Sequence, residues 1–166
     1  MVIFRKRIAG LNPSSLDRFV LRARKAIRLR DTVNVLVTNS HELRSLNRQF
    51  RGADKPTDVL SFPAPAAGQH EAKRLAGELA ISVDIARENA DRLGHSVADE
   101  VKILVLHGIM HLAGFDHEDD NGEMARAEKR LRKQLNLVTG LIERTPAPGH
   151  DRPIRKRSTG ARRKTA

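Results

Sequence analysis

The sequence of 166 residues contains no cysteine, no tryptophan and no tyrosine. Without cysteine, neither a disulfide framework nor a thiolate metal site can form, so a transition-metal site would need histidine and carboxylate ligands. Leu, Val, Ile and five Phe must fill the core, and no aromatic platform for stacking nucleic-acid bases is evident. A hydrophobic fraction of 39% is sufficient for one packed core in a chain of this length.

Long apolar runs are also missing. No stretch approaches the roughly 20 apolar residues that a membrane span requires. Residues 1–8 alternate in polarity and carry charge, which is unlike the apolar segment of a signal peptide. These absences predict a cytoplasmic protein without a membrane partner.

Positive charge is in excess and unevenly placed. The formal net charge is +11, and residues 143–166 contain eight Lys or Arg against two acidic residues. Such an excess by itself favours an anionic partner such as nucleic acid or a membrane surface. We expect a single catalytic, metal-binding domain over residues 1–140. Residues 141–166, rich in Pro, Gly and basic side chains, are predicted to form a disordered tail that either attracts phosphate or is simply solvated.

Alternating and helical patterns of apolar residues predict an α+β (mixed α/β) fold. We expect a small mixed sheet of about four strands packed with about five helices. The helix over 96–113 is apolar nearly all round, which is typical of a central buried helix. Ser14, Ser40, Ser96 and Asp119 or Asp120 are the predicted N-caps. Strands are expected at 2–8, 32–38, 58–62 and 78–83, and helices at 14–29, 40–49, 84–93, 96–113 and about 120–135.

Three histidines have the spacing of metal ligands. His107 and His111 are one turn apart on the predicted central helix, so both imidazoles project from one face. His117 could not join them on a continuous helix, but Gly114 allows the chain to turn back. Three protein ligands that leave one position open are typical of a catalytic zinc site. The sequence therefore predicts that these histidines bind one metal ion, Zn2+; the alternative is three unrelated histidines.

The residue after the first histidine distinguishes between kinds of zinc enzyme. Zinc proteases with the pattern H-E-x-x-H use the glutamate at this place as general base. Here the residue is Gly108, and Met124 lies in a helical pattern rather than in a Met-turn. Both features argue against peptide hydrolysis. A glycine inside a helix costs roughly 1 kcal/mol against alanine, which suggests a close backbone approach.

Two long motifs resemble those of the YbeY family of bacterial metal-dependent endoribonucleases. One is H-G-I-M-H-L-A-G-F-D-H, from His107 to His117, and the other is L-N-R-Q-F-R-G-A-D-K-P-T-D-V-L-S-F-P, over residues 46–63. The segments G-E-L-A-I-S and L-G-H-S are also similar to family segments. Phe50, Phe115 and Glu78 stand at positions that are often Tyr, Tyr and Asp. The resemblance covers roughly residues 30–120, and the tail lies outside it.

This resemblance implies a mixed α/β fold, one zinc ion held by three histidines, and cleavage of single-stranded RNA. It also implies rRNA processing at the 3′ end of the small-subunit RNA, ribosome quality control, and the ribosomal small subunit as a partner, with no DNA partner expected. The family's functionally important arginine falls on Arg51, the predicted catalytic residue. A metalloprotease-like hydrolase and a non-catalytic RNA-binding protein of ribosome assembly remain alternatives.

Four other residues keep two interpretations each. Lys55 is either a phosphate contact or an exposed loop lysine. Asp116 is either an acceptor that orients a ligand imidazole, or a turn residue or helix cap. His95 either lies near the site or has a structural role, of which the structural role is favoured. Arg51 without the resemblance would be a solvated loop arginine. No general base is evident in the sequence.

Overall fold

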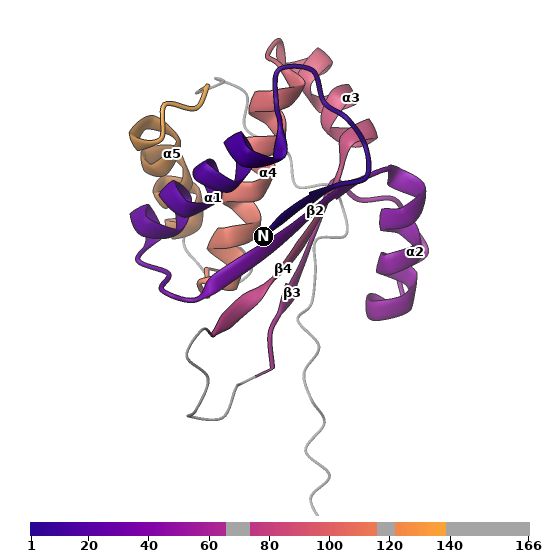
Figure 1. Ribbon diagram of the computed structural model, residues 1–166, viewed down its shortest axis with the longest axis horizontal. Helices are drawn as coiled ribbons and strands as arrows, with labels where there is room; N and C mark the ends of the chain where they lie inside the picture. Colours follow the sequence, from indigo (N-terminus) through magenta and orange to yellow (C-terminus); the bar gives the residue numbers. More distant parts are fainter. Residues whose placement is uncertain (66–73, 116–121, 139–166) are drawn as a thin grey trace, which may run out of the picture.

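A computed structural model describes residues 1–65, 74–115 and 122–138. Within these residues the chain forms five helices and one four-stranded sheet, which confirms the predicted α+β fold (Figure 1). The strands are β1 (Val2–Phe4), β2 (Thr32–Thr38), β3 (Val59–Pro63) and β4 (Leu75–Ser82). The helices are α1 (Pro13–Ile27), α2 (Ser40–Arg51), α3 (Val83–Leu93), α4 (Val97–Leu112) and α5 (Glu123–Gln134).

The sheet is mixed, with the strand order β1-β2-β4-β3. Strands β1, β2 and β4 are parallel, and β3 pairs antiparallel with β4 at the edge. Figure 1 shows α1, α4 and α5 on one side of the sheet and α2 on the other. The edge strand β3 contacts both α2 and the central helix α4.

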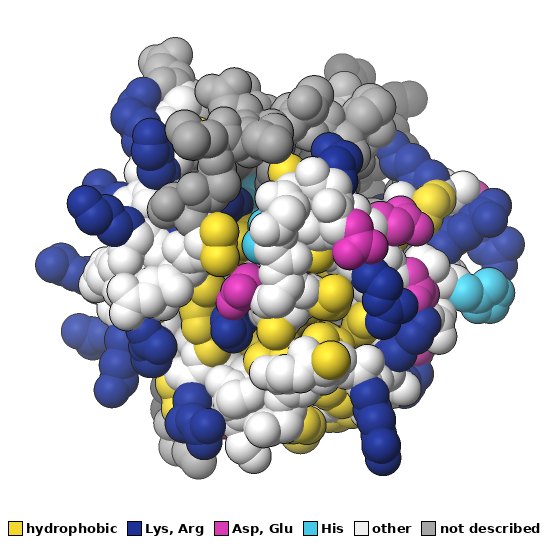
Figure 2. Space-filling view, turned by 90° about the horizontal axis from the view of Figure 1, so that it is seen from above, with side chains coloured by type: hydrophobic (Ala, Val, Ile, Leu, Met, Phe, Trp, Pro, Cys, Tyr) yellow, Lys and Arg dark blue, Asp and Glu magenta, His cyan; other side chains and the backbone are white. Residues whose placement is uncertain are grey.

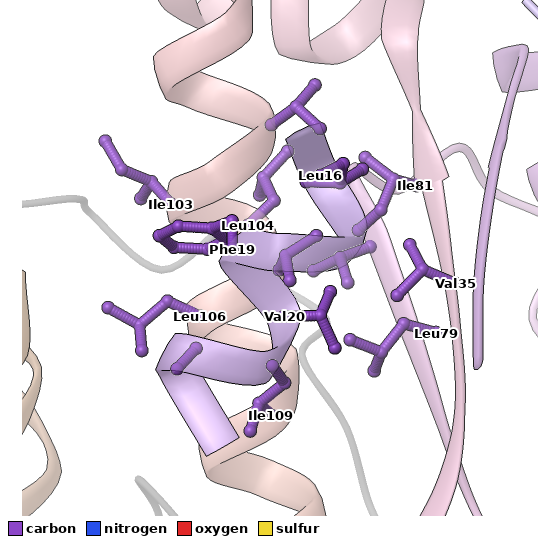
Figure 3. Packing of buried hydrophobic residues seen from close by; sticks show 14 of the residues in the cluster. Leu16, Phe19, Val20, Val35, Leu79, Ile81, Ile103, Leu104, Leu106 and Ile109 are labelled. Atoms are coloured by element: carbon purple, nitrogen blue, oxygen red, sulfur yellow. The ribbon is translucent and has the colours of Figure 1, made fainter. Parts of the chain in front are cut away.

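Helix α4 is the centre of the hydrophobic core. Its residues from Val101 to Met110 are almost all buried, because α1, α3, α5 and the sheet surround it. Figure 3 shows Leu104 and Ile109 of α4 packed with Val20 of α1 and Leu79 of β4. The prediction of a buried central helix from its all-round apolar pattern is confirmed.

The helix caps follow the expected chemistry, but at α1 the predicted residue was wrong. Asn12, not Ser14, caps α1: its side chain accepts a hydrogen bond from the Ser15 amide at 2.9 Å, and the Ser15 hydroxyl accepts one from the Asn12 amide at 3.2 Å. Pro13 then occupies the first helical position, where its missing N–H costs nothing. Asn39 likewise caps α2 in place of Ser40. At α4 the Ser96 hydroxyl accepts from the Asp99 amide at 3.0 Å, as predicted.

Other boundaries differ from the expected ones by a few residues. Strand β1 ends at Phe4 rather than at residue 8, and α2 extends to Arg51. Helix α5 begins at Glu123 with Gly122 at its N-cap position, where Asp119 or Asp120 was expected. Those two residues, and the predicted tail over 141–166, lie outside the described residues.

Among the helices that the structure describes, none is both long and apolar enough to cross a membrane.

Candidate metal centre

Helix α4 brings the first two candidate ligands together near its C-terminal end. The Nε2 atoms of His107 and His111 are 3.1 Å apart, and the two ring planes are inclined by 81°. His107 is buried, with 6% of its surface exposed, whereas His111 is partly exposed. The pair therefore presents two converging nitrogens at the rim of the core, as the one-turn spacing predicts.

The chain turns immediately after this pair. Helix α4 ends at Leu112, and Gly114 adopts a φ of +92°, which L side chains rarely adopt. The Gly114 amide donates to the carbonyl of His111 at 3.0 Å, and the amide of Phe115 donates to that of Met110 at 3.1 Å. The predicted helix end at this glycine is confirmed. His117, the third candidate ligand, lies outside the described residues, as does Asp116.

A buried carboxylate on α5 fixes the orientation of the first histidine. Glu128 Oε2 lies 3.0 Å from His107 Nδ1, and its other oxygen accepts from Arg132, one turn further along α5. A proton on Nδ1 directed at this carboxylate leaves the Nε2 lone pair of His107 directed at His111. A carboxylate behind a ligand imidazole is the usual support of a histidine metal site.

Glu128 is held in its charged form despite its burial. Burial by itself would raise the pKa of this carboxyl, but the hydrogen bond and charge of His107, with those of Arg132, hold the pKa at about 2. Sequence reasoning missed Glu128, although a signal existed. The residue stands on the apolar stripe of α5, at helical spacing from Met124 and Leu131, where a charge is unexpected.

The residue after His107 touches the sheet directly. A Cβ added at Gly108 would lie 2.7 Å from Leu79 Cδ2 and 3.2 Å from Ser61 Oγ, so α4 packs against β3 and β4 at this glycine. The expected close backbone approach is thereby confirmed. A side chain here would point into the sheet, away from the His107 imidazole. The general-base glutamate of a zinc protease has no room at this position.

Adding one methyl group at this contact should destabilise the protein. Gly108→Ala gains about 1 kcal/mol of helix propensity, but overpacking against Leu79 costs about 1–3 kcal/mol, so we expect a net loss of about 1 kcal/mol in the free energy of unfolding. In a Leu79→Ala background the same substitution should become stabilising, because the methyl group then fills space. Urea unfolding of the four proteins measures both values; an equal effect in the two backgrounds would contradict the predicted contact.

Arg51 lies beside β3, the edge strand of the sheet among the described residues. It is the last residue of α2, and its Nη2 donates to the carbonyl of Ser61 on β3 at 3.1 Å. The side chain of this same Ser61 faces Gly108, the neighbour of His107. Partial burial lowers the pKa of the Arg51 guanidinium. Arg51 is therefore partly buried at the end of a helix rather than in a loop, and its role in catalysis stays a prediction.

His95 belongs to a separate buried pair. Its Nε2 lies 2.8 Å from a carboxylate oxygen of Glu100, which is fully buried at the beginning of α4. Glu100 and His107 are seven positions apart, which is about 10 Å along a helix. The favoured structural role of His95 agrees with this position. Lys55 is exposed in the loop after α2, where its carbonyl accepts from Asn47 at 2.9 Å.

The two described histidines fit a zinc ion chemically. Tetrahedral bonds of about 2.0–2.1 Å place two ligand nitrogens roughly 3.3 Å apart, close to the 3.1 Å between the Nε2 atoms of His107 and His111. The same distance allows a hydrogen bond from one imidazole to the other when no metal is bound. Within 1–65, 74–115 and 122–138, no cluster of three His, Cys, Asp or Glu residues could hold a metal ion.

Comparison with known proteins gives a consistent result along most of the chain. The family model described as endoribonuclease YbeY matches residues 13–136. An endoribonuclease YbeY from Koribacter versatilis is 53% identical over 157 residues, covering 95% of this chain and 99% of that protein. One from Solibacter usitatus is 46% identical over 143 residues, covering 86% and 92%. One from Helicobacter pylori is 42% identical over 113 residues, covering 68% and 78%.

The fold has a solved counterpart. The solution structure of a Thermotoga maritima protein superposes with a TM-score of 0.52 at 29% identity, covering 81% of this chain and 89% of that one. The matched residues include strands β2, β3 and β4, helix α4 with its histidine pair, and the buried Glu128 of α5. The chain belongs to the endoribonuclease YbeY family.

Proposed function

We propose that this chain is a zinc-dependent endoribonuclease that cleaves single-stranded RNA. Membership of the family supports hydrolysis of phosphodiester bonds within RNA. The observation that carries the metal dependence is the convergence of His107 and His111, with Glu128 behind His107. His117 is the proposed third ligand. A zinc ion with one open coordination position activates water and polarises phosphate oxygens when it is bound.

The protein's own residues provide orientation and charge around this centre. Glu128 holds the proton of His107 on Nδ1, so that Nε2 is available as a ligand. Arg51, held at the edge of β3, is the proposed phosphate clamp, because its planar guanidinium donates several hydrogen bonds to oxyanions. Ser61 lies between Arg51 and the histidine helix, since its carbonyl accepts a hydrogen bond from Arg51 and its side chain faces α4.

The biological substrate that we propose is ribosomal RNA. The chain would act in the cytoplasm, on the 3′ end of the small-subunit RNA and in ribosome quality control, with the small ribosomal subunit as its partner. Net positive charge favours such a polyanion. Figure 2 shows Lys and Arg side chains along the left, right and lower edges of one face, not gathered in a single patch. This distribution fits general attraction of phosphate more than recognition of a base sequence.

A parallel assay tests the proposed reaction. The protein is given single-stranded RNA, the same RNA as a duplex, and casein, each with and without a chelator. We expect cleavage of the single strand alone, loss of cleavage with chelator, and recovery on addition of zinc. Hydrolysis of casein, or RNA cleavage that persists in chelator, would contradict the proposal. The chemistry of the new ends then identifies the nucleophile: a 5′-phosphate indicates water, and a 2′,3′-cyclic phosphate indicates the ribose hydroxyl.

Substitution of Arg51 tests the clamp. Arg51→Ala should lower kcat/KM for RNA about 10- to 100-fold, since a charge-assisted contact of about 1.5–3 kcal/mol is lost. Zinc content should stay unchanged. Arg51→Lys should recover only part of the loss, because a single ammonium cannot bind two oxygens in parallel. Arg87→Ala, on the exposed side of α3, is the matched control. Wild-type kinetics for Arg51→Ala with metal bound would remove Arg51 from the mechanism.

A further inference from the structure

Two phenylalanines far apart in the motif meet beside Arg51. The rings of Phe50 on α2 and Phe62 on β3 have centroids 5.3 Å apart and planes inclined by 66°, an edge-to-face pair. The sequence showed no aromatic platform, because these residues are separated by a loop. The fold places Phe50 over Phe62 and Arg51 over Ser61, the preceding residue of the same strand.

One ring of the pair is anchored and the other is open to solvent. Phe62 packs against the small apolar cluster of Leu43, Leu60 and Ala80, between α2 and the sheet. Phe50 is 48% exposed, so much of its ring surface faces solvent. Its contact with Phe62 restricts the ring, so the free surface of Phe50 is presented in a defined orientation.

Positive charge is in excess in the segment that carries this exposed ring. Residues 44–55 contain four Lys or Arg and one acidic residue, Asp54. Arg44 binds Asp54 through two parallel hydrogen bonds, of 2.8 and 3.1 Å. Net positive charge therefore remains on the segment, including Arg48, which is exposed. An aromatic surface among cations suits a single nucleic-acid strand, in which phosphates and unstacked bases alternate.

We propose that Phe50 stacks on an unpaired base of the RNA strand whose phosphate binds Arg51. Stacking on an aromatic ring accepts every base, so this contact selects unpaired over paired RNA and not one sequence over another. In a duplex the base would be covered by its neighbours and could not reach the ring. The inference rests on the proposed function, to which it adds a residue that distinguishes single from double strands.

Kinetics with matched substitutions test the contact in the full, metal-loaded chain. Phe50→Leu keeps an apolar side chain without a π face and should raise KM for single-stranded RNA about 5- to 100-fold, the range of one lost stacking contact. Phe50→Tyr should remain near the wild-type value, because it keeps the ring. A series of RNAs, each with one abasic nucleotide at a different position, identifies the stacked base. At that position the missing base should lower the affinity of the wild type but should not lower the affinity of Phe50→Leu further. A merely structural role for Phe50 would leave both proteins equally sensitive to every abasic position.

Fluorescence gives a second measurement, since the chain contains no tryptophan or tyrosine. In Phe50→Trp, rapid mixing with single-stranded RNA should quench the emission of the new indole before cleavage. Leu21→Trp, at a 47% exposed position on α1, is the matched control and should not change. Unchanged emission of Phe50→Trp, or wild-type KM for Phe50→Leu, overturns the inference while zinc-dependent RNA cleavage still stands. Absence of RNA cleavage by the wild type would overturn the proposed function itself.

Discussion

His111→Ala is expected to lose stoichiometric zinc and at least about a thousandfold of the RNA cleavage rate, because a bound metal supplies several kcal/mol of transition-state stabilisation. The reason is the short distance between the Nε2 atoms of His107 and His111, which would allow both nitrogens to coordinate one ion. Of the three proposed ligands, only His107 and His117 remain in this variant, which is fewer than the three protein ligands of a catalytic zinc site. Elemental analysis and cleavage of single-stranded RNA measure the two effects.

A readout independent of activity accompanies this substitution. Zinc at about 100 times its dissociation constant should stabilise the wild type by about 2.7 kcal/mol and His111→Ala by far less. Without zinc the two proteins should unfold at similar denaturant concentrations, since His111 is partly exposed. His41→Ala, at an exposed position of α2, is the matched histidine control and should behave as wild type. Full zinc occupancy in His111→Ala would exclude the three-histidine site.

Glu128→Ala is expected to produce the largest loss of stability. The substitution removes the acceptor of His107 and leaves the largely buried guanidinium of Arg132 without this carboxylate. Breaking a buried pair by removing one partner costs about 3–5 kcal/mol. Zinc affinity should also fall, by about 10- to 100-fold, because the imidazole is no longer oriented. Chemical unfolding and a zinc titration check the two values separately.

Graded substitutions separate the charge of Glu128 from its hydrogen bond. Glu128→Gln keeps an oxygen acceptor for His107 and should retain more zinc affinity than Glu128→Ala. The pKa of Glu128 is about 2 in the folded protein and 4.5 in the unfolded chain. The carboxylate therefore stabilises the folded state fully at pH values above about 4.5. This contribution is lost as the pH falls from about 4.5 toward about 2, a loss that Glu128→Gln should not show. Glu123→Ala, exposed in the first turn of α5, is the control; equal stabilities of all these variants would contradict the role of Glu128.

Local sequence patterns determined most of the helices and strands, and they identified the histidine pair of the site. The alternating valines of residues 32–38 predicted β2 with its observed bounds. The apolar sequence after Ser96 predicted the buried helix, and Gly114 predicted its end. His107 and His111 follow from the helical period alone, since residues four apart share a face. These features depend only on residues a few positions apart, so they can be predicted from one sequence.

Contacts between distant segments were decided by the tertiary structure. Glu128 reaches His107 across 21 residues of sequence, and Phe50 meets Phe62 across a loop. Neither contact can be predicted from spacing along the sequence, because the packing of α5 on α4 and of α2 on β3 sets the distances between these side chains. The Asn12 cap shows the same limit at short range: Asn and Ser are nearly equal caps, and only the observed backbone distinguishes them. The sequence by itself determined which groups α4 presents, and the fold determined which side chains support them.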